Sequence, residues 1–269
     1  MVRKLIKDAS EKLINSEEPL LDARVLLAAA MSKKDAALIF DYPDQAQLQL
    51  FNSYIEKRSH GIPVAYILGE KEFMGLTFKL NEDTLIPRPD TECLVEKIIE
   101  TNSFYSPKIL DLCTGSGCIG ISLLKFITDS SCDLTDISDG AIKMAEENAH
   151  TNNVSDRAGV FRLDVINDEF PLGYDIIVSN PPYIESDIIS DLSVSKYEPL
   201  RALDGGFDGL DFYRVIAKKA YNALKKGGML ALEIGYNQGE SVKALLSDFS
   251  DVSLYKDYGN NDRVIIAIK

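Results

Sequence analysis

Residues 108–120 read KILDLCTGSGCIG, and this stretch decides the fold. Its first five residues are rich in apolar side chains and predict a buried strand, and the glycines after them predict a tight turn into a helix. Gly115, Gly117 and Gly120 have the spacing G-x-G-x-x-G, which is typical of a loop whose backbone approaches a nucleotide-like ligand closely. No Gly-Lys-Ser/Thr sequence follows, so this is not a phosphate-binding P-loop.

A carboxylate follows the glycine loop at a spacing that suits a ribose. Asp136 ends the next predicted strand, about 20 residues after the loop. A carboxylate at this place accepts hydrogen bonds from both ribose hydroxyls. The loop and the acid together therefore predict a cofactor that contains a nucleoside. NAD fits them, and so does S-adenosylmethionine, whose charged amino-acid end Asp111 could help to organise.

From residue 90 onward, predicted strands and helices alternate along the chain. Apolar runs such as YDIIVS (174–179) and MLALEI (229–234) are interspersed with helical stretches, and this pattern predicts a mainly parallel sheet with helices on both faces. The last two predicted strands, 252–256 and 263–269, are separated by DYGNND. Because that connection is short, we expect an antiparallel hairpin at one edge of the sheet. The fold class is therefore α/β and Rossmann-like.

The first 60 residues have a different pattern, typical of a small helical bundle. The stretch from Asp44 to Ser59 places apolar side chains on one helical face, and a short helical run is expected after Ser32, through Ile39. Glycine and proline then punctuate short alternating runs, which predict a hairpin. We expect three segments: a helical domain over 1–62, a β-hairpin linker over 63–86 and an α/β domain over 87–269.

Composition and charge limit the possible partners. The 269 residues carry 29 basic and 42 acidic side chains, for a net charge of -13, and 45% are hydrophobic. These are the proportions of a globular protein with a real core. Residues 1–70 have a net charge of -1 and the rest of the chain has -12. Because this surface repels phosphate backbones, no direct nucleic-acid substrate is expected.

No membrane, metal or disulfide chemistry is predicted. The apolar run 25–31 is much shorter than the ~20 residues that span a bilayer, and the first residues lack the apolar core of a secretory signal. We therefore expect a cytoplasmic protein without a membrane partner. The four cysteines have no CxxC spacing and are expected to be buried free thiols. The two histidines lie far apart in the sequence, so no metal site is expected.

The tetrapeptide Asn180-Pro181-Pro182-Tyr183 follows the predicted strand 174–179, at the end of the sheet where open α/β folds bind ligands. A planar NH2 group offers two N–H donors, which the Asn180 side-chain oxygen and the Pro181 carbonyl oxygen can accept. Two prolines stiffen the turn, and Tyr183 offers a flat face for stacking. The turn therefore predicts a site that holds an amide or a base amine and aims its nitrogen at a methyl donor.

With these motifs the chain resembles the S-adenosylmethionine-dependent amino-methyltransferases, a class that includes DNA adenine-N6 and protein glutamine-N5 enzymes. Four further segments are similar to the HemK/PrmC-type N5-glutamine methyltransferases of peptide chain release factors. These are FMGLTF (73–78), LIPRPDTE (85–92), EPLRALDGGFDGLDFY (198–213) and LEIGYNQG (232–239). The similarity runs from about residue 18 to the C-terminus, and in that family the helical N-terminal domain helps to engage the protein substrate.

The resemblance implies S-adenosylmethionine as the cofactor and a release factor as the protein partner. We expect the cofactor to be bound by Asp111, Cys113, Thr114, Gly115, Ser116, Gly117, Asp136, Asp164, Val165 and Asn180. We expect catalysis to use Asn180, Pro181 and Tyr183, and the substrate to be bound by Asn180, Pro181, Pro182, Tyr183 and Arg88.

Three positions carry particular expectations. Cys113 stands where the family usually has glycine, which puts a side chain near the cofactor, and Val165 stands where relatives often carry an aromatic residue. Arg88 lies between two prolines, and either contacts a substrate or cofactor carboxylate or pairs with an acid. Glu198 and Arg201 lie in a long connection that could close over the substrate.

The expected reaction is attack of a glutamine amide nitrogen on the sulfonium methyl group, driven by positioning and electrostatics and without a strong general base. The alternative is a DNA adenine-N6 methyltransferase that uses the same Asn-Pro-Pro-Tyr chemistry on a flipped base, which the acidic charge disfavours. In an oxidoreductase that uses the glycine loop, this tetrapeptide would have no role. The intact Asn180 and Tyr183 disfavour a non-catalytic adaptor.

Overall fold

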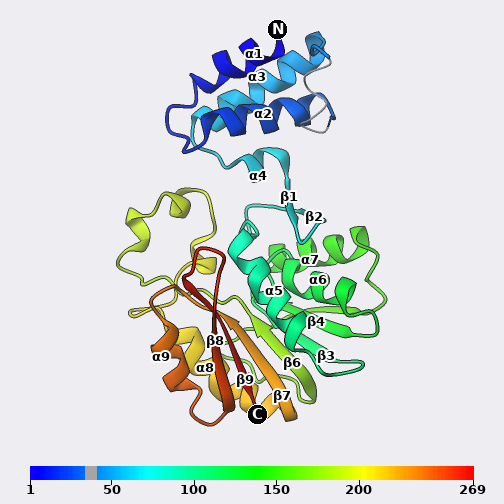
Figure 1. The fold of residues 1–269 in the computed structure, drawn as a ribbon, viewed down its shortest axis with the longest axis vertical. Helices are drawn as coiled ribbons and strands as arrows, with labels where there is room; N and C mark the ends of the chain where they lie inside the picture. The colour runs from blue at the N-terminus through cyan, green and yellow to red at the C-terminus, as the bar shows by residue number, and fades with distance from the viewer. Residues whose placement is uncertain (34–40) are drawn as a thin grey trace. The chain divides into compact units, whose positions relative to one another are not determined.

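The computed structural model describes residues 1–33 and 41–269. The short helical run predicted after Ser32, through Ile39, falls mainly on residues 34–40, outside the described part of the chain. The chain divides into two compact units, Met1–Glu70 and Lys71–Lys269. Figure 1 shows that helices build the first unit and that the second contains the large sheet.

The helices of the first unit pack around a small apolar core. They are α1 (Val2–Ser10), α2 (Pro19–Ala30), α3 (Gln45–Ser59) and α4 (Val64–Leu68). Helix α3 begins where Asp44 and Gln47 form a reciprocal capping box, in which each side chain accepts from the backbone N–H of the other residue at 2.9 Å. Leu26, Leu27 and Phe51 are fully buried between the helices. This packing agrees with the bundle that the sequence predicts.

A hairpin lies at the start of the second unit. Its strands are β1 (Glu70–Phe73) and β2 (Leu76–Lys79), joined by a two-residue turn at Met74 and Gly75. Both turn residues have positive φ, 51° and 71°, as the twist of a tight hairpin requires. The rings of Phe73 and Phe78 meet edge to face, with their centroids 6.1 Å apart, and both are buried in the core of the second unit.

The large sheet has seven strands in the order β5-β4-β3-β6-β7-β9-β8. Their bounds are β3 (Lys108–Leu112), β4 (Ser131–Asp136), β5 (Ala158–Arg162), β6 (Tyr174–Ser179), β7 (Leu224–Glu233), β8 (Ser250–Lys256) and β9 (Asp262–Ile268). Strands β3 to β7 pair in parallel, whereas β9 is antiparallel to both β7 and β8. The predicted α/β sheet with an antiparallel C-terminal hairpin is confirmed. Because β4 and β6 lie on opposite sides of β3, a ligand crevice is expected at the carboxyl ends of these strands.

Helices cover both faces of the sheet (Figure 1). They are α5 (Pro89–Thr101), α6 (Cys118–Phe126), α7 (Asp139–Thr151), α8 (Asp211–Ala223) and α9 (Gly239–Leu245). Successive residues of a strand point to opposite faces, so Ile109 packs in the core formed with α5, α6 and α7. Its neighbour Leu110 packs in the core formed with α8 and α9. Between β6 and α8 runs a long connection with the short turns η2 (Ile189–Asp191), η3 (Ser193–Lys196) and η4 (Leu200–Ala202).

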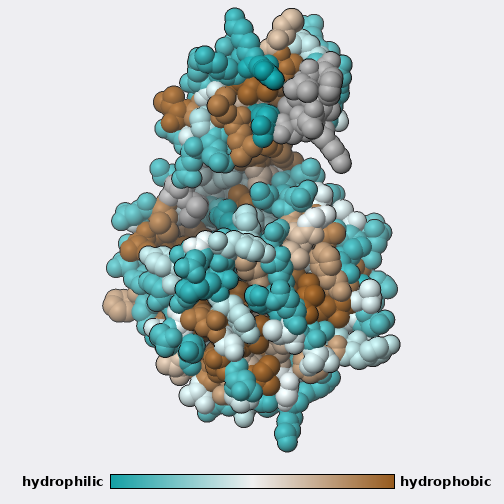
Figure 2. Space-filling view, viewed as in Figure 1, coloured by the Kyte–Doolittle hydropathy of each residue, from teal (hydrophilic) through white to brown (hydrophobic). Residues whose placement is uncertain are grey.

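Hydrophilic side chains cover most of the visible face, with apolar side chains gathered in patches (Figure 2). Cys93, Cys118 and Cys132 are buried free thiols, as expected, whereas Cys113 is only half-buried. Over the described ranges, no helix has the length and apolar character needed to cross a membrane. In the same ranges, no three His, Cys, Asp or Glu side chains are grouped so that they could hold a metal ion.

Candidate functional site

The glycine loop connects the end of β3 to the start of α6 and has a left-handed backbone at three positions. Cys113, Gly115 and Gly117 have φ values of 57°, 55° and 82°. Gly120, one turn into α6, allows this helix to pack closely on the sheet, because a Cβ there would lie 2.2 Å from a methyl carbon of Leu134. The spacing of the glycines is therefore explained by the turn and by helix packing. At Cys113 the left-handed backbone costs free energy that a glycine would not incur.

Asp111 is buried beneath this loop and holds it from inside. Its Oδ2 accepts hydrogen bonds from the Thr114 hydroxyl at 2.6 Å and from the Gly120 N–H at 3.0 Å. Its Oδ1 has no partner among the described residues. Burial raises the pKa of Asp111 to about 7. The side chain does not line the neighbouring cavity, so its visible role is to fix the path of the loop.

Asp136 lies at the end of β4, beside the same loop. Its Oδ2 accepts from the Gly115 N–H at 3.0 Å and its Oδ1 from the Ser138 N–H at 2.9 Å. Burial raises the pKa of the carboxyl above its usual value, and the backbone N–H groups oppose this shift. Each oxygen has one backbone donor and a further lone pair to offer. The carboxylate is therefore held in place and can still accept hydrogen bonds from a ligand.

A cavity of about 440 Å³ opens at the carboxyl ends of β3, β4 and β6, within the size range of small-molecule sites. Ten of the predicted site residues line it: Arg88, Cys113, Thr114, Gly115, Ser116, Asp136, Asp164, Val165, Asn180 and Pro182. Asp111, Gly117, Pro181 and Tyr183 do not line it. The fold therefore brings together residues from positions 88 to 182. Of the other four predicted residues, three directly adjoin lining residues in the chain, and Asp111 holds the loop from inside.

Asp164 and Val165 form one wall of the cavity, after β5. The Asp164 carboxylate accepts from the Asn167 side-chain amide at 2.8 Å and from the Ile166 N–H at 2.9 Å. The hydrogen bond from Asn167 lowers the pKa of Asp164 below its usual value. Val165 is buried, so this wall combines an aliphatic surface with an ionised carboxylate.

The Asn-Pro-Pro-Tyr turn begins directly after β6. The Asn180 Nδ2 donates to the Thr91 hydroxyl oxygen at 3.4 Å. The Tyr183 carbonyl oxygen accepts from the Gln238 side-chain amide at 3.0 Å, and burial raises the pKa of the Tyr183 hydroxyl to about 12. The chain at Gly205 crosses so close to the turn that a Cβ there would lie 2.7 Å from the Tyr183 Cα. The turn is therefore held by three other segments of the unit.

Arg88 forms the ion pair that was one of its two predicted roles. Its partner is Glu198, whose carboxyl is buried and whose Oε2 also accepts from the Ile86 N–H at 3.2 Å. Glu198 thus ties the long connection to the segment before α5. Arg88 lines the cavity as well, and Arg201 lies close enough to lower the pKa of Asp136.

Sequence reasoning missed several residues of the cavity wall, among them Asp83, Leu85, Thr91, Ile137, Asn167 and Phe212. Leu85, Thr91 and Phe212 fall inside the segments 85–92 and 198–213, which carry the family resemblance. Ile137 directly follows Asp136. The family resemblance of these segments could have indicated such residues as site candidates. Only the order of the strands, however, shows which residues line the cavity.

Comparison with known proteins identifies the family. Two family models match, a methyltransferase small domain over residues 89–195 and a PrmC N-terminal domain over residues 4–69. The release factor glutamine methyltransferase of Clostridium acetobutylicum is 38% identical over 270 residues, which cover 96% of this chain and 94% of that protein. This chain belongs to the release factor glutamine methyltransferase family. Another relative of that name, from Agrobacterium fabrum, is 40% identical and covers 92% of this chain and 90% of its own length.

The resemblance predicted from the motifs is therefore confirmed, and the fold agrees with it. A methyltransferase from Pyrococcus furiosus superimposes with a TM-score of 0.55 at 19% identity, covering 74% of this chain and 91% of that one. At this identity the likeness concerns the fold alone. It supports a methyltransferase fold for the second unit of this family member, the unit that contains the seven-stranded sheet.

Proposed function

We propose that this chain transfers the methyl group of S-adenosylmethionine to the side-chain amide nitrogen, N5, of a glutamine in a peptide chain release factor. One observation carries the proposal. The Asn180-Pro181-Pro182-Tyr183 turn stands at the edge of the cavity that the glycine loop and Asp136 form. A site for a nucleoside cofactor and an acceptor for a planar NH2 group therefore lie side by side. The protein substrate is the one named for the relatives, a release factor.

The described residues fit the proposed cofactor. The carboxylate of Asp136 has lone pairs left for two ribose hydroxyls, and the apolar side chains of Ile137 and Val165 would contact the adenine. The glycine loop would hold the amino-acid end, since its residues 113–116 line the cavity. When bound, S-adenosylmethionine supplies an electrophilic methyl group on a sulfonium. The chain itself has to bind, orient and shield the two reactants.

The acceptor side of the site positions the substrate amide. The Asn180 Oδ1 and the Pro181 carbonyl oxygen would each accept one N–H of the glutamine amide, because an NH2 group has two donors in one plane. These hydrogen bonds increase the electron density on the nitrogen and fix its direction. Pro182 stiffens the turn, and Tyr183 anchors it through its backbone contact with Gln238. No general base is needed, because the N–H becomes acidic only as the new bond forms.

The domain division remains part of this proposal. The first segment, 1–62, would engage the release factor, and its match to a PrmC N-terminal domain over 4–69 supports that role. Residues 63–86 would link it to the catalytic part, 87–269. The net charge of -12 beyond residue 70 favours a protein glutamine over a DNA adenine as the acceptor.

The test is incubation with S-adenosylmethionine and purified release factors, followed by peptide mass spectrometry. The expected result is a mass increase of one CH2 on a single glutamine-containing peptide. Duplex DNA and a release factor with that glutamine replaced serve as parallel substrates. Methyl transfer to DNA adenine with none to the release factor would contradict the proposal.

A further inference from the structure

Asn180 is connected through one hydroxyl to a buried carboxyl group. Its Nδ2 donates to the Thr91 Oγ1 at 3.4 Å, and the Thr91 hydroxyl lies close enough to the carboxyl of Glu233 to lower the pKa of that group. Thr91 is in the first turn of α5, is buried and lines the cavity. Glu233 is the last residue of β7. The three side chains come from separate elements, and the strand order brings them to the same end of the sheet.

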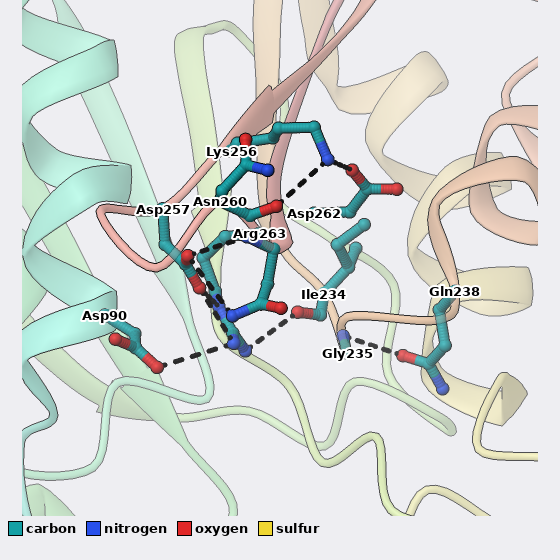
Figure 3. Close-up of polar contacts among 10 residues, drawn as sticks. Asp90, Ile234, Gly235, Gln238, Lys256, Asp257, Asn260, Asp262 and Arg263 are labelled. Carbon is teal, nitrogen blue, oxygen red and sulfur yellow. Dashed lines mark hydrogen bonds and ion pairs between the residues drawn. The ribbon is translucent and has the colours of Figure 1, made fainter.

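The buried Glu233 carboxyl has no ion pair to account for it among the described residues. It is 1% exposed, and its Oε2 accepts no hydrogen bond in the described part of the chain. The two cations that influence it have other partners, since Arg88 pairs with Glu198 and Arg263 pairs with Asp257. Figure 3 shows the Arg263 guanidinium between Asp257 at 3.1 Å and Asp90 at 3.4 Å, with the Ile234 carbonyl 3.2 Å away. A buried carboxyl without an ion pair costs stability, which suggests that it serves the site.

The chemistry of these groups gives the connection a direction. An ionised carboxylate can only accept hydrogen bonds, so the Thr91 O–H must point toward Glu233. The lone pairs of the Thr91 oxygen are then left for an N–H group, which Asn180 supplies through its NH2. The two ends of an asparagine amide have nearly the same shape. Fixing the NH2 end on Thr91 therefore turns the carbonyl end, Oδ1, away from Thr91.

We propose that Thr91 and Glu233 are positioning residues, which set the end of the Asn180 amide that faces the substrate. The inference rests on the proposed function, in which the Asn180 Oδ1 accepts an N–H of the glutamine. With the amide reversed, an NH2 group would face the substrate NH2, and two donors cannot form a hydrogen bond with each other. Cutting the connection at Thr91 should therefore lower turnover and leave the cofactor site intact.

The connection also predicts that the orientation of the Asn180 amide depends on pH. Desolvation raises the pKa of Glu233 to about 7, so the carboxyl is protonated below that pH. It can then donate to Thr91, whose hydroxyl becomes free to donate to the Asn180 oxygen, and the reversed amide is no longer disfavoured. The charged and titratable groups that face Glu233 come from four elements and the turn after β6. They are Arg88 and Asp90 beside and at the start of α5, Cys118 on α6, Arg263 on β9, Tyr183 after β6 and Tyr213 on α8.

The experiment compares Thr91→Val and Thr91→Ser with the wild-type chain, using S-adenosylmethionine and a release factor. Valine keeps the shape and removes the hydroxyl, and we expect kcat to fall roughly 10-fold to 100-fold. The KM for the release factor and the cofactor Kd from calorimetry should stay within about 2-fold, because both sites remain. Serine restores the hydroxyl and should restore most of the turnover. Thr101→Val, the same substitution at the exposed end of α5, is the matched control.

The pH profile separates this role from a merely structural one. The ratio of wild-type to Thr91→Val turnover should shrink as the pH falls below about 7. In the wild type, protonated Glu233 no longer fixes the direction of the Thr91 hydroxyl and, through it, of the Asn180 amide. The titration of any other group affects the turnover of both proteins equally, so its effect cancels in this ratio. Equal kcat for the two proteins, or a Thr91→Ser variant as impaired as Thr91→Val, would overturn the inference.

Two further outcomes are kept distinct by the same assay. A wild-type chain that methylates no release factor contradicts the proposed function itself. An active wild type with an equally active Thr91→Val variant contradicts only the positioning role. If the valine variant does not fold, Thr91→Ala removes the same hydroxyl and is subject to the same comparison.

Discussion

The cofactor half of the cavity, formed by residues 113–116 and Asp136, and the acceptor half, formed by Asn180, Pro182 and Thr91, are held in different ways. Both Asp136 oxygens accept backbone N–H groups at 2.9–3.0 Å. Asn180, in contrast, is tied by its side chain to another side chain, at 3.4 Å. Backbone donors are placed by the fold, whereas a side-chain partner must itself be oriented. Cofactor affinity and turnover should therefore respond to different mutations.

The largest expected effect is on the acceptor half. Asn180→Ala removes one oriented acceptor and should lower kcat by on the order of 10² or more, by analogy with the loss of one preorganised polar group. The cofactor Kd should change little, because Asp136 and the loop remain. Asn222→Ala, an exposed position on α8, is the control. Steady-state assays with near-normal turnover would remove Asn180 from the mechanism and erase the contrast between the halves.

Asp136→Ala should instead weaken cofactor binding and leave turnover at saturating cofactor largely unchanged. Loss of a charge-assisted hydrogen-bond acceptor costs about 1.5–3 kcal/mol, which corresponds to roughly 10-fold to 100-fold weaker cofactor binding. Saturating cofactor should recover much of the turnover. Calorimetry measures the affinity, with Asp129→Ala, an exposed acid before β4, as the control. Unchanged affinity would show that the ribose is held elsewhere.

The buried carboxyl beneath the cofactor half predicts a smaller effect, on stability. The pKa of Asp111 is raised to about 7 by burial, so the folded state binds a proton more tightly than the unfolded chain does. Stability contributed by the protonated group is present at low pH and is lost as the pH rises toward and through 7. Asp111→Asn keeps an oxygen acceptor and removes this charge, so its melting temperature should fall less between pH 5 and about 8.

A shallower pH slope for Asp111→Asn than for the wild type, measured by thermal unfolding, would support this account. Part of the slope should remain, because Glu233 also has a pKa raised to about 7 by burial. Identical slopes for the two proteins would mean that Asp111 does not titrate in this range, and that the loop rests on a permanently ionised carboxylate.

The same contrast explains what could be predicted from the sequence. The glycine loop, Asp136 and the Asn-Pro-Pro-Tyr turn are each local, since each motif follows a single strand. Thr91 and Glu233 are far from Asn180 in the chain, and they come near it only because α5 begins, and β7 ends, close to the end of β6. The hydrophobic pattern predicts strands, but it does not set their order or the direction of a hydroxyl. The residues that orient the site were therefore harder to find than the residues that form it.

Cys113 offers the smallest and sharpest test of the idea that the backbone builds the cofactor half. Its φ of 57° is left-handed, a conformation that costs a residue with a Cβ roughly 1–2 kcal/mol. Both Cys113→Gly and Cys113→Ala remove the thiol. The glycine variant also removes the cost of the left-handed backbone, whereas the alanine variant keeps it. Although glycine usually destabilises relative to alanine through the unfolded chain, we expect the glycine variant to be more stable here by about 0.5–1 kcal/mol. Urea unfolding measures the difference. A more stable alanine variant would mean that packing, and not the backbone conformation, decides this position.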